Sequence, residues 1–181
     1  PYTFRGYPTH FTPPDPTDNG VQLLQAIGAG PINHRVTVST LAGFVQDHLG
    51  FDLSAPLDAA DWLTFPQQKL GVLTGGRVYW DEVGLEDVRA RFRWYPHDVW
   101  RYLLAAGWAR LGQEEHLMGR AGLAGDELGS GLIGARLVRD VMRLAFLMER
   151  RYAPYPKWFG TAFGRLHCAA ELTPLLWRAQ Q

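Results

Sequence analysis

The chain has 181 residues, and its 18 basic and 18 acidic side chains cancel to zero formal net charge. Its content of 46% hydrophobic and 20% charged residues is typical of a globular protein that buries an ordinary core without disulfide support. The charge balance excludes a global field directed at nucleic acid, so nucleic-acid binding is not indicated and any basic site must be local.

The remaining composition excludes several other classes of protein. The single cysteine, Cys168, rules out an internal disulfide and a cysteine-cluster metal site. The six histidines show no ligand spacing, so no zinc site is predicted. No apolar run is long enough to cross a bilayer, and the N-terminus has no secretory pattern. We therefore expect no membrane association and a cytoplasmic location.

The first forty residues favour short strands and loops. Residues 2–12 alternate aromatic and polar side chains, which predicts one or two short edge strands. Residues 13–20 are dense in turn formers, and residues 21–29 fit a strand or a helix equally well. Residues 34–39 (HRVTVS) alternate with β-branched residues and predict a strand.

Short helices are expected in the middle of the chain. Ser39 or Thr40 can cap the first of them, Gly50 can end it, and Asp58 can cap the second. Pro66 stands at a favoured first-turn position and opens the third. The expected helices cover 41–49, 58–63, 66–74 and 85–92, and a short strand is expected at 77–80.

Longer helices are expected after Tyr95. An apolar stripe at three- and four-residue steps predicts a helix that begins near Pro96 and ends in a glycine-rich break. Asp126 can cap a helix from Glu127 to about Tyr152, whose arginines form a narrow stripe, and two closing helices follow at 157–165 and 169–177. The arginines of the stripe are Arg136, Arg139, Arg143 and Arg150.

The predicted fold class is α+β, mostly α, with a boundary near residue 90. Residues 1–90 are mixed α/β and contain too few strands for a stable sheet of their own. Residues 91–181 predict a helical bundle. The chain begins with Pro1 inside a strand-like pattern, so we expect a preceding segment in a longer protein.

Several stretches resemble an uncharacterised helical domain family that follows a minimal, polymerase-β-like nucleotidyltransferase domain in many bacterial proteins. The most specific are GDELGS at 125–130 and YAPYPKW at 152–158. Softer matches are FRGYP at 4–8, DWL at 61–63, VYWDEVG at 78–84, YPHDVWRYLLAAGW at 95–108, QEE at 113–115 and GR at 119–120.

The resemblance implies a layout similar to that of aminoglycoside nucleotidyltransferases. Residues 1–90 would then be the C-terminal part of a nucleotidyltransferase-like α/β domain. In such proteins a Gly-Ser turn and an Asp-x-Asp pair hold Mg²⁺ and a nucleoside triphosphate. This sequence has no Gly-Ser turn followed by such a pair, so the half that holds Mg²⁺ would lie upstream of Pro1 or be absent.

The catalytic residues are unknown, and Glu114 and Glu115 are weak candidates. Both continue the apolar stripe of their helix, so they are either carboxylates facing a cleft or solvated side chains at a frayed end. Arg120 is a plausible partner for them and a candidate substrate-binding residue. Asp126 is also a candidate, although an N-cap is its simpler role.

The remaining candidates are basic and aromatic. Arg143 is the best single ligand-binding candidate of the arginine stripe, because clustered arginines repel one another unless anions answer them. The resemblance favours Tyr155, Lys157 and Trp158 as nucleotide-binding residues, with the lysine at a triphosphate and the aromatic rings against a base. We expect Glu115, Arg143 and Lys157 to converge on one hollow.

The leading hypothesis is therefore the C-terminal part of a nucleotidyltransferase-like protein, inactive alone. Its helical lid would position substrate for Mg²⁺-dependent transfer from an NTP to a small-molecule or macromolecular hydroxyl acceptor. The alternative is a non-catalytic helical interaction module whose acidic and basic residues form an internal salt-bridge network.

Overall fold

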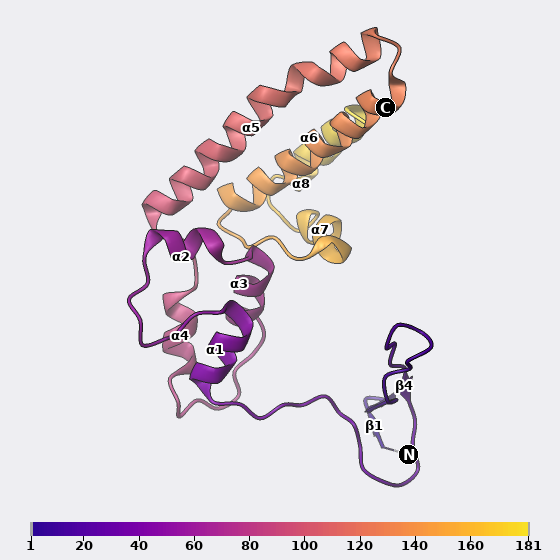
Figure 1. The fold of residues 1–181 in the computed structure, drawn as a ribbon, viewed down its shortest axis with the longest axis vertical. Helices are drawn as coiled ribbons and strands as arrows, with labels where there is room; N and C mark the ends of the chain where they lie inside the picture. Colours follow the sequence, from indigo (N-terminus) through magenta and orange to yellow (C-terminus); the bar gives the residue numbers. More distant parts are fainter. Residues whose placement is uncertain (1, 181) are drawn as a thin grey trace. The chain divides into compact units, whose positions relative to one another are not determined.

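The structure is a computed structural model that describes residues 2–180. Its contacts group the chain into two compact units, one ending at Thr40 and one beginning at Leu41 (Figure 1). This division does not coincide with the predicted boundary near residue 90, because residues 41–90 share one core with the helices that follow. The assignment of residues 1–90 to a nucleotidyltransferase-like domain stays a prediction.

The first unit contains two small antiparallel sheets. Strand β1 (Thr3–Phe4) pairs with β2 (Tyr7–Pro8), and β3 (His10–Phe11) pairs with β4 (Leu24–Gln25). The short strands predicted in residues 2–12 are confirmed, and none of residues 2–40 is buried. The strand predicted at 34–39 is wrong, because the alternating segment has no neighbouring strand with which to form a ladder.

The second unit is helical, so the chain is mostly α with some β, as predicted. Helices predicted from capping residues are confirmed with small shifts at their ends. The helices are α1 (Leu41–Leu49), α2 (Ala59–Thr64), α3 (Gln67–Thr74), α4 (Leu85–Arg91), α5 (His97–Leu123), α6 (Glu127–Met148), α7 (Pro156–Phe163) and α8 (Ala169–Arg178).

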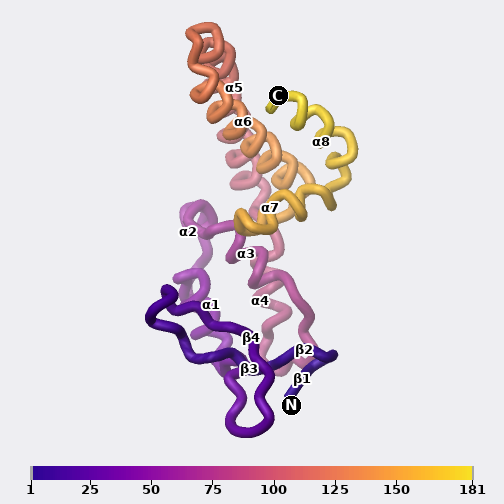
Figure 2. Tube along the Cα trace, turned by 90° about the vertical axis from the view of Figure 1, so that its right-hand side faces the viewer, coloured from indigo at the N-terminus to yellow at the C-terminus, as the bar shows by residue number. Residues whose placement is uncertain are grey.

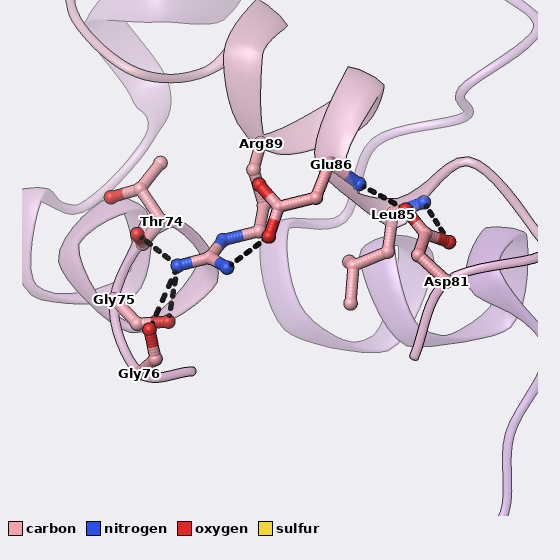
Figure 3. A network of polar contacts seen from close by, with 7 residues as sticks. All are labelled: Thr74, Gly75, Gly76, Asp81, Leu85, Glu86 and Arg89. Carbon is pink, nitrogen blue, oxygen red and sulfur yellow. Dashed lines mark hydrogen bonds and ion pairs between the residues drawn. The ribbon is translucent and has the colours of Figure 1, made fainter. Parts of the chain in front are cut away.

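The segment from Gly75 to Gly84 is a pinned loop, and the strand predicted at 77–80 is wrong. The Arg89 guanidinium donates to the carbonyl oxygens of Thr74, Gly75 and Gly76 at 2.6, 2.8 and 3.1 Å (Figure 3). At the other end of the loop, the Asp81 carboxylate accepts hydrogen bonds from the first amides of α4. Side-chain contacts therefore hold a segment that has no strand beside it.

Helices α5 and α6 form a long hairpin closed by a tight turn. Gly125 adopts φ 82°, and the Asp126 side chain accepts a hydrogen bond from the Gly129 amide at 2.8 Å, which confirms the predicted cap. Helix α6 ends at Met148, short of Tyr152, because Arg150 adopts φ 53°. The Arg151 amide then donates to the Phe146 carbonyl at 2.9 Å, a turn that ends the helix before the prolines.

Two clusters of buried side chains form the core of this unit. The larger cluster joins residues before and after position 90, and in it the Trp62 ring contacts the rings of Phe65, Phe92 and Tyr95. The smaller cluster joins α6 to the last two helices. Figures 1 and 2 show α6 lying between α5 on one side and α7 and α8 on the other. Helix α6 therefore contributes buried side chains to both clusters.

Two glycines of α5 make a matched test of this packing. A Cβ atom at Gly107 would lie 2.6 Å from Cδ2 of the buried Leu144, whereas a Cβ atom at Gly112 would meet nothing within 4 Å. We expect Gly107→Ala to lower the free energy of unfolding by about 1–3 kcal/mol, because the added methyl group would overpack the core between α5 and α6. Gly112→Ala should raise it by roughly 0.5–1 kcal/mol through helix propensity. Chemical denaturation of both variants checks this, and equal shifts would contradict it.

Candidate functional site

A groove of about 560 Å³ opens on α6 in the second unit. One wall is the start of α3, with Gln67 and Gln68, and another is α6, with Arg139 and Arg143. The turn between α6 and α7 closes it with Ala153, Pro154, Tyr155 and Pro156. A concave site with a few polar groups on rigid walls is the usual form of a small-ligand site.

Local chemistry explains why these three segments meet. The left-handed Arg150 ends α6 and returns the chain toward α3, where the Ala153 amide donates to Oε1 of Gln67 at 3.0 Å. The two prolines that follow fix φ and limit the freedom of this wall. Arg139 and Arg143 are four residues apart, so they lie one above the other on one face of α6. The groove is therefore defined before any ligand enters it.

The arginine stripe is divided between paired and unpaired side chains. Nε of Arg136 lies 2.7 Å from Glu114 on α5. Outside the stripe, Nε of Arg110 on α5 lies 2.7 Å from the buried Asp140 on α6. Within residues 2–180, no carboxylate forms an ion pair with Arg139 or Arg143. Two adjacent like charges repel each other, and a bound anion relieves that repulsion. The groove thus has the electrostatic character of an anion site.

Tyr95 interacts with two residues of the groove, because it forms a hydrogen bond with Gln67 and its pKa is affected by the charge of Arg143. Burial raises the pKa of the Tyr95 phenol to about 12, and the nearby Arg143 charge and the hydrogen bond with Gln67 oppose that rise. The phenol is therefore neutral around pH 7. It links the aromatic core to the Gln67 side chain, which in turn holds the Ala153 amide.

The Tyr95 phenol should make stability fall at alkaline pH. Its pKa rises from 10.0 in the unfolded chain to about 12 in the folded protein, so its contribution is complete below pH 10 and is lost as pH rises through 12. Tyr95→Phe should lower the free energy of unfolding by about 1 kcal/mol at neutral pH, because the hydrogen bond is lost. The free energy of unfolding of this variant should also fall less steeply with pH in the alkaline range. Denaturation across this pH range measures both, with the exposed Tyr79→Phe as control. An unchanged alkaline slope in Tyr95→Phe would contradict the assignment.

A second hollow, of about 710 Å³, adjoins the groove. The two share Gln68, Pro154, Tyr155 and Pro156, so a single wall borders both. The lining of the second hollow includes the aromatic residues Tyr152, Tyr155 and Trp158 together with Lys69. The side chains of Tyr155 and Trp158 are 44% and 50% exposed, so their rings are accessible to a ligand.

The structure brings together only some of the predicted site residues. Arg143 and Tyr155 line the groove, and Trp158 lines the adjoining hollow. Lys157 lines neither, and its ammonium lies 5.3 Å from the centre of the Trp158 ring. The expected convergence of Glu115, Arg143 and Lys157 is wrong, because only Arg143 lines this groove.

The other predicted site residues have structural positions. Glu114 forms the ion pair with Arg136, and Asp126 caps α6. Glu115 and Arg120 are exposed on α5. Sequence reasoning missed Gln67 and Gln68, because polar residues in a first helical turn look solvated and carry no signal of a groove. Roles in ligand binding stay predictions for all of these residues.

The described residues do not supply the metal set that the resemblance implies. Within residues 2–180, no three histidine, cysteine, aspartate or glutamate side chains gather closely enough to hold a metal ion. We therefore derive no step through Mg²⁺ on this part of the chain. In the same residues, no helix combines the length and the apolar character needed to cross a bilayer.

The described residues form a helical domain with a groove that is lined by two arginines. Residues 62–159 match the family described as "Domain of unknown function (DUF4037)". The match covers more than half of the chain, and the chain belongs to this family. It spans the residues that line the groove, from α3 to Phe159. No curated protein and no solved structure matches the chain.

Proposed function

We propose that this chain is the helical, substrate-positioning part of a nucleotidyltransferase-like protein, and that the groove holds the polyphosphate of a nucleoside triphosphate. The observation that carries the proposal is the pair of arginines, Arg139 and Arg143, that line the groove without a carboxylate partner among the described residues. Arginine presents a planar fork of donors that matches phosphate oxygens in a bidentate arrangement.

The proposed chemistry is in-line transfer of a nucleotidyl group. An acceptor hydroxyl oxygen bonds to the α-phosphorus, the bond to the β-phosphate bridging oxygen breaks, and pyrophosphate leaves with that electron pair while a base takes the hydroxyl proton. Positioning and charge neutralisation account for most of the catalysis of such a reaction. The groove supplies both to the phosphates. Mg²⁺ and its ligands belong to another part of the protein in this proposal, and the chain alone is expected to be inactive.

The alternative is a non-catalytic helical interaction module. It is favoured by the two ion pairs that bridge α5 and α6, Arg136 with Glu114 and Arg110 with Asp140. Of these pairs, only Arg136 with Glu114 involves an arginine of the stripe, and it accounts for one of the four as internal structure. They leave Arg139 and Arg143 unexplained, which is why the ligand site is the better supported proposal.

Calorimetric titration of tripolyphosphate and of ATP into the full chain tests the proposal. Binding that falls steeply with salt, and that survives Lys157→Ala, supports a site at the arginines. The variant matters because the sequence favours Lys157 at the triphosphate, whereas the groove does not include it. The proposal fails if neither compound binds at low salt.

A further inference from the structure

We propose that the hollow beside the groove is a ring-binding subsite, so that the ligand is a phosphorylated molecule with a planar ring, of which a nucleotide is the type. This inference rests on the proposed function, because the ligand's phosphates lie at Arg139 and Arg143. The ring lies on the other side of Tyr155, against Trp158.

The continuity of the two hollows is the first support. Gln68, Pro154, Tyr155 and Pro156 line both, so a ligand anchored at the arginines extends along the same wall into the second hollow. The character of the lining changes along that wall. Arg139 and Arg143 line only the first hollow, and Tyr152 and Trp158 line only the second, together with Lys69. A polyphosphate joined to an aromatic ring has the same two-part chemistry.

The exposure of the aromatic side chains is the second support. Tyr155 and Trp158 are 44% and 50% exposed, whereas the core rings of Trp62 and Phe92 are 4% and 0% exposed. The prolines at 154 and 156 restrict the backbone on both sides of Tyr155, so the main chain of this wall loses little freedom when a ligand packs against it. Stacking on a preorganised ring tolerates any base, since every base has a π-face.

Polar groups near the rings could form hydrogen bonds with the edge of a base. The Gln68 amide carries both a donor and an acceptor and lines both hollows. His48 also lines the second hollow, and its Nε2 lies 3.1 Å from the Lys69 carbonyl oxygen. A carbonyl can only accept, so Nε2 is the donor in this contact. The ring subsite thus combines stacking surfaces with hydrogen-bonding groups.

Three probes titrated into the full chain without Mg²⁺ test the inference: tripolyphosphate, ATP and adenosine. ATP carries no more negative charge than tripolyphosphate, so tighter binding of ATP must come from the nucleoside. We expect ATP to bind roughly tenfold more tightly than tripolyphosphate, the effect of stacking one base. Trp158→Ala should abolish that difference by weakening ATP alone, and Trp158→Phe should retain most of it. The exposed Trp177→Ala is the matched control and should change neither affinity.

The results that would overturn the ring subsite differ from those that would overturn the phosphate groove. Equal affinities for ATP and tripolyphosphate in the wild type would overturn the ring subsite and leave the phosphate groove standing. A Trp158→Ala variant that keeps the full preference for ATP, or that weakens both probes alike, would also overturn it. Adenosine that binds while tripolyphosphate does not would overturn the phosphate groove and the two-part ligand together. No binding of any probe would remove both proposals.

Discussion

Replacing Arg143 with alanine is expected to weaken tripolyphosphate binding to the full chain by roughly 10- to 100-fold at low salt. A hydrogen bond between charged groups is worth about 1.5–3 kcal/mol, and Arg143 lines the groove without an ion-pair partner among residues 2–180. Arg143→Lys should recover only part of the affinity, because a lysine ammonium cannot form the bidentate contact. Titration calorimetry of the three proteins measures the difference.

A control variant that loses one positive charge outside the groove distinguishes binding in the groove from attraction by the net charge of the protein. Arg101 is exposed on α5 and has no ion pair among the described residues, so Arg101→Ala removes the same charge away from the groove. We expect it to leave affinity nearly unchanged at moderate salt. Equal losses in the Arg101 and Arg143 variants would show that the anion binds through net charge alone. An unaffected Arg143 variant would end the case for the groove.

Replacing Trp62 with alanine is expected to lower the free energy of unfolding by about 3–5 kcal/mol. The side chain is 4% exposed and contacts the rings of Phe92 and Tyr95 at centroid distances of 5.6 and 5.5 Å. Trp80 is the matched control, because it is 80% exposed on the pinned loop. Trp80→Ala should shift stability by no more than about 0.5 kcal/mol. Denaturant unfolding followed by circular dichroism compares the two.

The same variant also tests how residues 41–90 relate to the helices after residue 91. Trp62 stands in α2, while its ring partners Phe92 and Tyr95 follow α4. If the second unit has one core, Trp62→Ala should lower the stability of the α5–α6 hairpin together with that of α2 in a single transition. A hairpin that keeps its wild-type midpoint while α2 unfolds would contradict the shared core.

The helices were predictable because their signals are local. Asp58 and Asp126 act as N-caps, as their sequence positions indicate, and each bonds an amide three residues ahead. The strands predicted at 34–39 and 77–80 do not form, because an alternating pattern shows only that a segment can pair. Pairing also requires a neighbour, and the structure provides none to either segment. The left-handed Arg150 ended α6 without the glycine that usually marks such a turn.

The sequence by itself determined a mostly helical fold, its caps and a stripe of arginines on one long helix. It could not decide which arginines are free, because that depends on what lies across from each of them. Arg136 meets Glu114 of the neighbouring helix, whereas Arg143 faces a groove closed by a turn near residue 154. Glu114 is 22 residues from Arg136 in the chain, and Gln67 of the groove is 76 residues from Arg143, so only tertiary packing separates a charge that is already neutralised from one that is still available to a ligand.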